Sequence, residues 1–174
     1  MPQPRSENRA LLPSAKVLFV CTGNICRSPT AECVFRALVV REKLDTRIVM
    51  DSAGTHDYQL GRRPDPRAVS AARRRGYALG GHIARQVEAR DFSSFDWILA
   101  MDRYNLAVLQ SLQPRTYRGR LALFLDFVPQ LPLREVPDPY DGTAEDFEYV
   151  LDLAETGAAG LLQTVRAHLA PRTD

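Results

Sequence analysis

The sequence predicts an α/β fold, a doubly wound, Rossmann-like parallel sheet of four strands flanked by helices. Two observations predict it. Short apolar runs of strand length alternate along the chain with longer segments of helical periodicity, the pattern of parallel strands joined by crossover helices. The 174 residues, 45% of them hydrophobic, suffice for one domain with a substantial core.

Four segments have the composition expected of strands. The first is the apolar run Val-Leu-Phe-Val within residues 16–20, which reads as a strand buried on both faces. The other three expected strands are residues 47–51, 95–101 and 120–125.

Helical signals fill the segments between these strands. The expected helices are residues 29–43, 66–75, 104–112 and a last one that starts near residue 143. Gly76 stops the second of them, and Asp102 can cap the third. The last carries apolar residues at helical spacing, although Gly157 and Gly160 are expected to weaken it locally.

Charge and composition limit the partners and the compartment. Residues 1–14 are polar, contain three prolines and are expected to form a flexible arm before a single domain at 15–174. The net charge of +2 gives no reason to expect a nucleic-acid partner, and no segment has the apolar length of a membrane span. Three cysteines do not make a secreted disulfide framework, so the predicted compartment is cytoplasmic.

The loop after the first strand carries the candidate site. Its sequence, Cys-Thr-Gly-Asn-Ile-Cys-Arg-Ser at 21–28, leads into Pro29, where the helix is expected to begin with Ser28 as its N-cap. Such a loop aims N–H groups and the positive end of a helix dipole at whatever it encloses. That field favours a thiolate at Cys21, and the planar fork of Arg27 suits two phosphate oxygens at once. The loop therefore predicts a phosphate-binding site with its own nucleophile.

Two other interpretations of the cysteines were open. Cys21 can be a small buried hydrophobe at a strand end, where many free cysteines lie. The three cysteines can be metal ligands, but Cys21, Cys26 and Cys33 lack zinc-ligand spacing. Neither interpretation accounts for an arginine and a helix start in the same loop. We therefore predict that the protein uses no metal and no cofactor.

The loop resembles the active-site loop of the low-molecular-weight protein tyrosine phosphatases. Four later segments are similar to landmarks of that family and follow in the same order, at residues 51–55, 84–86, 101–102 and 138–140. The similarity extends over about residues 16–169. It implies that 15–174 is a phosphatase domain that hydrolyses phosphotyrosine in substrate proteins through a cysteinyl-phosphate intermediate and releases inorganic phosphate.

A phosphatase of this kind needs a nucleophile, an anion clamp and a proton donor. Cys21 is expected to attack phosphorus and Arg27 to bind the equatorial oxygens. Asp138 is the expected general acid and base, because Pro137 and Pro139 fix the backbone on both sides of it. The alternative for Asp138 alone is an ordinary turn aspartate. The loop residues expected to surround the phosphate are Thr22, Gly23, Asn24, Ile25, Cys26 and Ser28.

The resemblance also implies a substrate rim and a supporting shell. Tyr58 and Tyr140 are expected to wall a slot deep enough for a phenyl phosphate. His82 matches a family position beside Asn24, whose side chain is expected to brace the loop in left-handed geometry. Ser52 is expected nearby, because it follows the second strand at the same edge of the sheet.

Two residues suggest features of this chain's own. Cys26 lies five positions after Cys21 in a curved loop, so oxidation is expected to join them in a reversible disulfide. Asp141 occupies a position where many family members carry a second tyrosine, and its charge is expected to disfavour acidic substrates. We expect a monomer or a weak dimer.

Three other functions fit parts of the pattern. Arsenate reductases of the same fold need further cysteines, and no cysteine follows Cys33. A phosphate-binding module does not need Cys21, Arg27 and Asp138 together. A phosphocysteine carrier of sugar transport would form the intermediate without needing Asp138. Within the family, phosphoarginine stays open as an alternative to phosphotyrosine.

Overall fold

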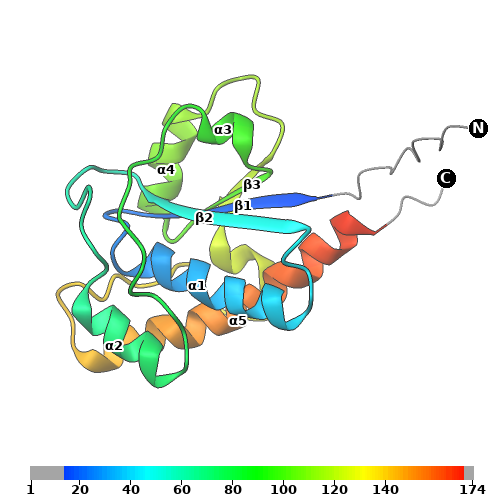
Figure 1. Cartoon of the computed structure of the whole chain (residues 1–174). Helices are drawn as coiled ribbons and strands as arrows, with labels where there is room; N and C mark the ends of the chain where they lie inside the picture. The colour runs from blue at the N-terminus through cyan, green and yellow to red at the C-terminus, as the bar shows by residue number, and fades with distance from the viewer. Residues whose placement is uncertain (1–13, 171–174) are drawn as a thin grey trace, which may run out of the picture.

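A single parallel sheet organises the chain (Figure 1). The computed structural model describes residues 14–170, so all but the last residue of the expected arm lies outside the described residues. The strands are β1 (Ala15–Cys21), β2 (Ile48–Gly54), β3 (Trp97–Ala100) and β4 (Arg120–Leu123), in the order β2-β1-β3-β4 with every pair parallel. The fold class predicted from the sequence is confirmed.

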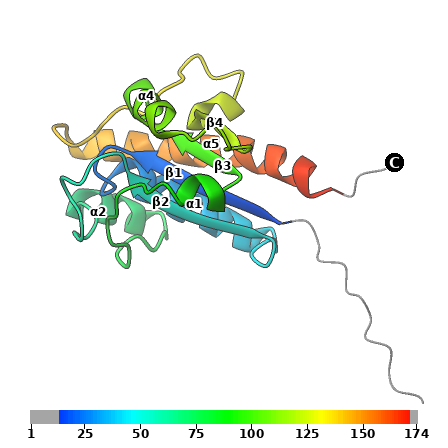
Figure 2. The ribbon, with the colours of Figure 1, turned by 90° about the horizontal axis from the view of Figure 1, so that it is seen from above.

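Helices cover both faces of this sheet. They are α1 (Arg27–Arg41), α2 (Pro66–Arg74), α3 (Asp91–Ser94), α4 (Arg103–Leu112) and α5 (Ala144–Leu169), with a 3-10 turn η1 (Phe124–Phe127) after β4. Figure 1 shows α1 and α5 on one side of the sheet and α3 and α4 on the other. The view from above shows β1 between its two neighbours (Figure 2).

The side chains of strand β1 contribute to a hydrophobic core on each face of the sheet. Side chains alternate along a strand, so Val17 and Phe19 join the core beneath α1 and α5, whereas Leu18 and Val20 join the core beneath α3 and α4. All four are completely buried. An uninterrupted apolar run is therefore what a strand with two covered faces requires.

Helix α5 contains two glycines that pack closely against η1. It runs unbroken through Gly157 and Gly160, where local weakening was expected. A Cβ atom at Gly157 would lie 2.5 Å from the buried ring of Phe124, and one at Gly160 would meet the backbone of Phe127. The glycines therefore let α5 approach η1 closely, and the packing offsets their low helix propensity.

The start of α1 was predicted wrongly. The helix begins at Arg27 instead of Pro29, with Cys26 as its N-cap, and Ser28 does not cap it. Pro29 falls in the first turn, where a missing N–H breaks no helical hydrogen bond, so proline does not mark the first residue here. The helix ends at Arg41, two residues before the expected end, and Lys43 follows with a positive φ of 58°.

Three strands also have ends that differ from the prediction by two residues or more, and β3 begins at Trp97 instead of residue 95. Strand β2 continues past residue 51 to Gly54, which pairs with Cys21. A Cβ atom at Gly54 would lie 2.7 Å from the Thr22 carbonyl oxygen, so only glycine allows this approach. Strand β4 stops at Leu123, because the Asp126 carboxylate accepts its N–H and starts η1. The short α3 was not predicted.

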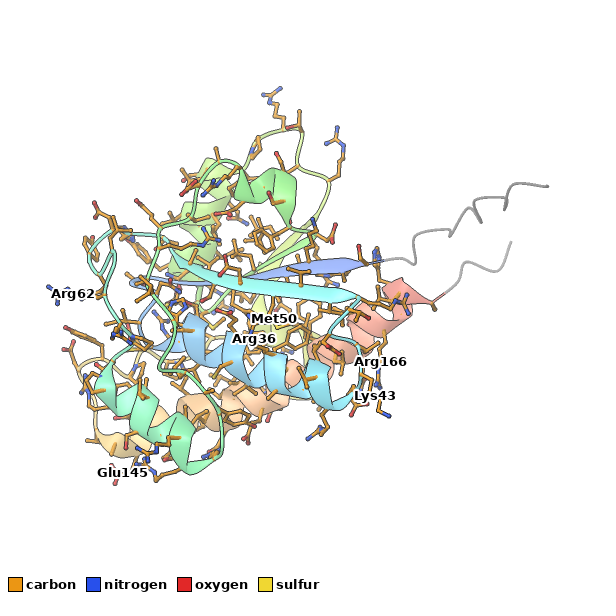
Figure 3. The ribbon with its side chains drawn as sticks, viewed as in Figure 1. Arg36, Lys43, Met50, Arg62, Glu145 and Arg166 are labelled. Carbon is orange, nitrogen blue, oxygen red and sulfur yellow. The ribbon has the colours of Figure 1, made fainter. Side chains whose placement is uncertain are left out.

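Side chains connect the layers at the edge of the sheet (Figure 3). Arg36 of α1 donates to the carbonyl of Met50 in β2 at 3.3 Å. Arg166 near the end of α5 forms an ion pair with Glu42, next to Lys43 after α1. Within residues 14–170 no helix is long and apolar enough to span a membrane.

Candidate active site

The site lies at the point where the order of the strands in the sheet reverses direction. From β1 the chain passes to β2 on one side, then returns to β3 on the other side of β1. In such sheets a crevice forms beyond the carboxyl ends of the strands at the switch point. The loop at 21–27 lies there, between the end of β1 and the start of α1.

The backbone of this loop is arranged to receive an anion. Its carbonyls are held from outside: Cys21 accepts the N–H of Thr55 at 2.8 Å, and Ile25 accepts that of Asp65 at 2.9 Å. Asn24 has a φ of 57°, the left-handed geometry that asparagine tolerates, as predicted. A curved loop whose carbonyls face outward has its N–H groups available to an anion on the inside.

Asn24 is the centre of a buried hydrogen-bond network. Its side-chain amide donates to the hydroxyls of Ser28 at 2.9 Å and Ser52 at 3.0 Å. Its side-chain oxygen accepts the backbone N–H of Arg85 at 2.9 Å and faces Nε2 of His82 at 3.0 Å. Four hydrogen-bond partners on three segments of the chain thus fix the conformation of the loop at Asn24.

The three cysteines have different surroundings. Cys21 Sγ lies 3.0 Å from the Ser28 hydroxyl and accepts the N–H of Asn24 at 3.3 Å. Burial, followed by the charge of Asp65, raises the pKa of Cys26 well above its usual range. Burial likewise raises the pKa of Cys33 to about 12. Donors to sulfur are therefore concentrated at Cys21, while Cys26 and Cys33 remain neutral thiols near pH 7.

Arg27 is buried and held by two carboxylates. One guanidinium nitrogen donates to Asp102 at 2.5 Å and to the Val136 carbonyl at 3.1 Å; the other donates to Asp138 at 3.2 Å. Burial alone would lower the pKa of Arg27, but the charges of Cys21 and Asp138 and the bond to Asp102 raise it. The arginine is therefore a fixed, permanent cation at the edge of the loop.

Asp138 is half exposed at the mouth of the site. Its carboxylate accepts the backbone N–H of Tyr140 at 3.2 Å in addition to the bond from Arg27. Arg67 donates to the Tyr140 carbonyl at 2.8 Å, and its guanidinium lies over the Tyr140 ring, 5.9 Å from the centroid. These contacts anchor the segment after Pro137 to the start of α2.

A cavity of about 150 Å³ joins these groups. Its lining consists of Cys21, Thr22, Gly23, Ile25, Cys26, Arg27, Tyr58, Gln59, Asp138 and Tyr140. Thus the expected nucleophile, cation, carboxylate and both aromatic walls meet at one cavity. Asn24, Ser28, Ser52 and His82 support the loop from behind, whereas Asp141 is exposed and lies outside the lining.

The sequence did not predict the contacts that four further residues make in the site. Asp102 was expected as a helix cap at a strand end beside the cleft, but not as the partner of Arg27 that the structure shows it to be. Glu32 accepts from the Ser52 hydroxyl at 2.7 Å, and the Asn105 amide lies 3.0 Å from the Thr22 hydroxyl. Gln59 lines the cavity. A signal existed for Asp102 alone, since it follows β3 at the edge where strand ends converge.

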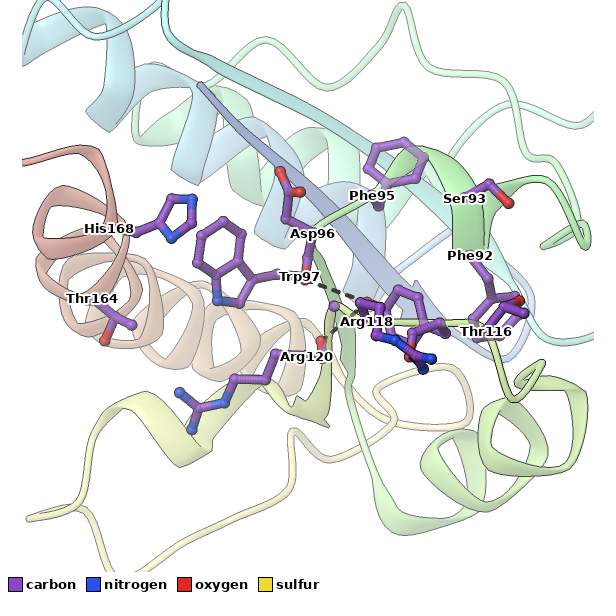
Figure 4. A pocket seen from close by; sticks show the side chains of 12 residues that line it. Phe92, Ser93, Phe95, Asp96, Trp97, Thr116, Arg118, Arg120, Thr164 and His168 are labelled. Atoms are coloured by element: carbon purple, nitrogen blue, oxygen red, sulfur yellow. Dashed lines mark hydrogen bonds between the residues drawn. The ribbon is translucent and has the colours of Figure 1, made fainter. Parts of the chain in front are cut away.

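A larger cavity, of about 740 Å³, lies at the opposite edge of the sheet (Figure 4). Asp96 and Trp97 at the start of β3 and Arg120 at the start of β4 line it, with His168 of α5 in contact with the Trp97 ring. None of the candidate catalytic residues lines it. Among the described residues, no group of three His, Cys, Asp or Glu side chains is placed to hold a metal ion.

Comparison with known proteins assigns this architecture to a family. Residues 16–170 match the family model described as low molecular weight phosphotyrosine protein phosphatase. The pig protein of that name is 43% identical over 152 residues, which cover 86% of this chain and 95% of the pig protein.

Solved structures have the same fold. A protein tyrosine phosphatase from Entamoeba histolytica superposes with a TM-score of 0.85 at 38% identity, covering 88% of this chain and 98% of that one. An arginine phosphatase from Drosophila superposes with a TM-score of 0.82 at 30% identity, covering 87% and 98%.

Proposed function

The chain belongs to the low molecular weight phosphotyrosine protein phosphatase family, and we propose that it hydrolyses phosphotyrosine in proteins through Cys21, Arg27 and Asp138. The observation that carries these roles is that the three side chains line one small cavity beside a loop built for an anion. A thiol, a fixed guanidinium and a carboxylate are the groups that phosphoryl transfer to a cysteine and on to water requires.

Cys21 is the proposed nucleophile. Its thiolate accepts hydrogen bonds from Asn24 N–H and the Ser28 hydroxyl, which stabilise the negative sulfur before attack and as a leaving group afterwards. The sulfur forms a bond to phosphorus as the bond from phosphorus to the phenolic oxygen breaks. Water then attacks phosphorus, the bond to sulfur breaks, and inorganic phosphate leaves.

Arg27 and the loop N–H groups bind the transferring phosphoryl group. The charge on its equatorial oxygens redistributes in the transition state, and donors already in place stabilise it without rearrangement. Asp102 and the Val136 carbonyl hold one guanidinium nitrogen, so the other nitrogen and the face toward the cavity serve the substrate. Asp102 therefore acts as a positioning residue for Arg27.

Asp138 transfers the protons. In its protonated form it donates to the leaving phenolic oxygen, and as a carboxylate it then accepts a proton from the attacking water. Its place at the mouth of the cavity, half exposed and 3.2 Å from Arg27, suits both steps. Phosphate entering the loop would compete for the Arg27 nitrogen that Asp138 contacts, freeing the carboxyl group for the leaving oxygen.

The walls of the cavity favour an aryl phosphate. Tyr58 and Tyr140 both line it, so a phenyl ring bound against them would reach the loop with its phosphate. Phosphoarginine is the second candidate, because a planar guanidinium also stacks on tyrosine and a structural neighbour is an arginine phosphatase.

Activity on three substrates tests the proposal. We expect the wild-type protein to hydrolyse p-nitrophenyl phosphate and a phosphotyrosine peptide faster than a phosphoarginine peptide of the same sequence. Cys21→Ser should abolish turnover, and Asp138→Asn should lower kcat about 10²–10⁴-fold on the peptide, whose leaving group needs a proton. Phosphate binding without turnover in the wild type would favour a binding module or carrier instead.

We further propose that the protein acts in the cytoplasm as a monomer or a weak dimer. The support is the small net charge of +2 and a sequence without a disulfide framework. Sedimentation across a concentration series and fractionation of the source cells test these two statements. A dimer stable at nanomolar concentration, or recovery outside the cytoplasm, would contradict them.

A further inference from the structure

Three aromatic rings stand in a row beside the cavity. His56 lies between Tyr58 and Tyr104, with its ring centroid 4.9 Å from that of Tyr58 and 5.7 Å from that of Tyr104. The interplanar angles are 18° and 9°, so the three rings are nearly parallel. Tyr58 lines the cavity, while Tyr104 belongs to the first turn of α4. The row therefore connects a wall of the substrate cavity to a helix.

Tyr58 needs such support. Its side chain belongs to the loop after β2 and is 66% exposed, so few contacts hold its ring in one place. An exposed aromatic ring that must lie against a substrate loses affinity if it has to be ordered at each binding event. The stacking contact with His56 supplies that order in advance.

Both ring nitrogens of His56 and its backbone N–H have hydrogen-bond partners. Nδ1 lies 2.8 Å from the Thr55 hydroxyl and Nε2 lies 3.2 Å from the Tyr104 hydroxyl. Hydroxyls both donate and accept, so either neutral tautomer of the ring is satisfied. Its backbone N–H donates to the Thr22 carbonyl at 3.1 Å, which ties it to the phosphate loop. The imidazole is thus a rigid spacer between two tyrosines.

We propose that His56 and Tyr104 are positioning residues that set the affinity for aromatic substrates by holding Tyr58 against the cavity. This rests on the proposed function of the site. Neither residue lines the cavity, so each is expected to act through Tyr58. Removing either ring should weaken binding of the substrate ring equally before and in the transition state, which raises KM and leaves kcat unchanged.

Matched variants separate the ring contact from the hydrogen bonds. His56→Ala and Tyr104→Leu remove a ring, whereas His56→Phe and Tyr104→Phe keep the ring and remove polar atoms. We expect the first pair to raise KM for a phosphotyrosine peptide roughly three- to tenfold, the size of an aromatic pair contact, and the second pair to restore most of it. Tyr149→Leu, at an exposed tyrosine of α5, is the control and should change nothing.

Equilibrium binding provides a readout that a general disturbance of the site would not give. Benzylphosphonate fills both the ring slot and the loop, while inorganic phosphate fills the loop alone. His56→Ala should weaken the binding of benzylphosphonate by the same factor by which it raises KM. The binding of inorganic phosphate should be unchanged. In a Tyr58→Ala background, His56→Ala should have no further effect, because the ring it positions is gone.

Two results in the presence of Tyr58 would overturn the inference: an unchanged KM in both ring-removing variants, or equal weakening of phosphate binding and benzylphosphonate binding. Persistence of the His56→Ala effect without Tyr58 would also overturn it. A wild-type protein that binds benzylphosphonate without turnover would refute the proposed function instead, and the binding series would still test the stack.

Discussion

Two substitutions of Asp102 separate the two roles of its carboxylate, the ion pair with Arg27 and the N-cap of α4. Its Oδ2 atom binds Arg27 at 2.5 Å, and its Oδ1 atom accepts the backbone N–H of Asn105 at 2.7 Å, which caps α4. Asparagine at 102 keeps an oxygen for the cap but removes the charge beside Arg27. Alanine removes both. The difference between the two variants therefore isolates the cap, and Asp102→Asn isolates the ion pair.

The expected magnitudes follow from these contacts. A hydrogen bond to a charged group contributes about 1.5–3 kcal/mol, and Arg27 is buried, so Asp102→Asn should lower the free energy of unfolding by about 2 kcal/mol. Loss of the cap adds about 1 kcal/mol, so Asp102→Ala should lower it by about 3 kcal/mol. Arg27 keeps its bonds to the Val136 carbonyl and Asp138, which limits the loss in both variants.

Urea unfolding and steady-state kinetics together measure the effect. With its guanidinium less firmly oriented, Arg27 should stabilise the transition state less, and kcat on p-nitrophenyl phosphate should fall about ten- to hundredfold in both variants. Asp126→Asn is the matched control, because Asp126 caps η1 away from the site and should leave kcat unchanged. An Asp102→Asn protein with wild-type stability and kcat would refute the assigned role of the pair.

Three further results are expected. Gly157→Ala should destabilise the protein by about 1–3 kcal/mol in urea, because the added methyl group meets the Phe124 ring; a more stable variant would contradict the packing argument. Peroxide should inactivate the wild type reversibly, and thiol should restore less activity to Cys26→Ser, where Cys21 has no partner thiol; equal recovery would exclude the disulfide. Asp141→Asn should improve kcat/KM for phosphopeptides with acidic flanks relative to basic ones, and an unchanged ranking would show that this exposed carboxylate does not select substrates.

The sheet and the loop could be predicted because both depend on local pattern. The apolar run of β1 and the cap at Asp102 are signals within a few residues, and both are confirmed. The start of α1 was missed because Ser28 and Pro29 together resemble an N-cap and a first helical residue. In the structure the Ser28 hydroxyl contacts the sulfur of Cys21 instead. This contact within the site, and not the preference of serine for the N-cap position, determines where Ser28 lies.

The rest of the site depends on contacts between residues far apart in the sequence. Asp102 meets Arg27 and His56 meets Tyr104 only after the strands have brought their loops to one edge. Nothing within a window of neighbouring residues distinguishes Glu32 from any other charged residue on a helix, although it accepts from a buried serine. Such partners follow from tertiary structure and not from propensity.

Trapping the phosphorylated enzyme tests the central claim most directly. The Asp138→Asn protein, mixed with p-nitrophenyl phosphate and quenched during turnover, should carry phosphate on the peptide that contains Cys21. The leaving group needs little protonation, whereas water lacks its base in the second step, so the intermediate should accumulate. Continued turnover with Cys21 unmodified, or turnover that survives Cys21→Ser, would contradict the account.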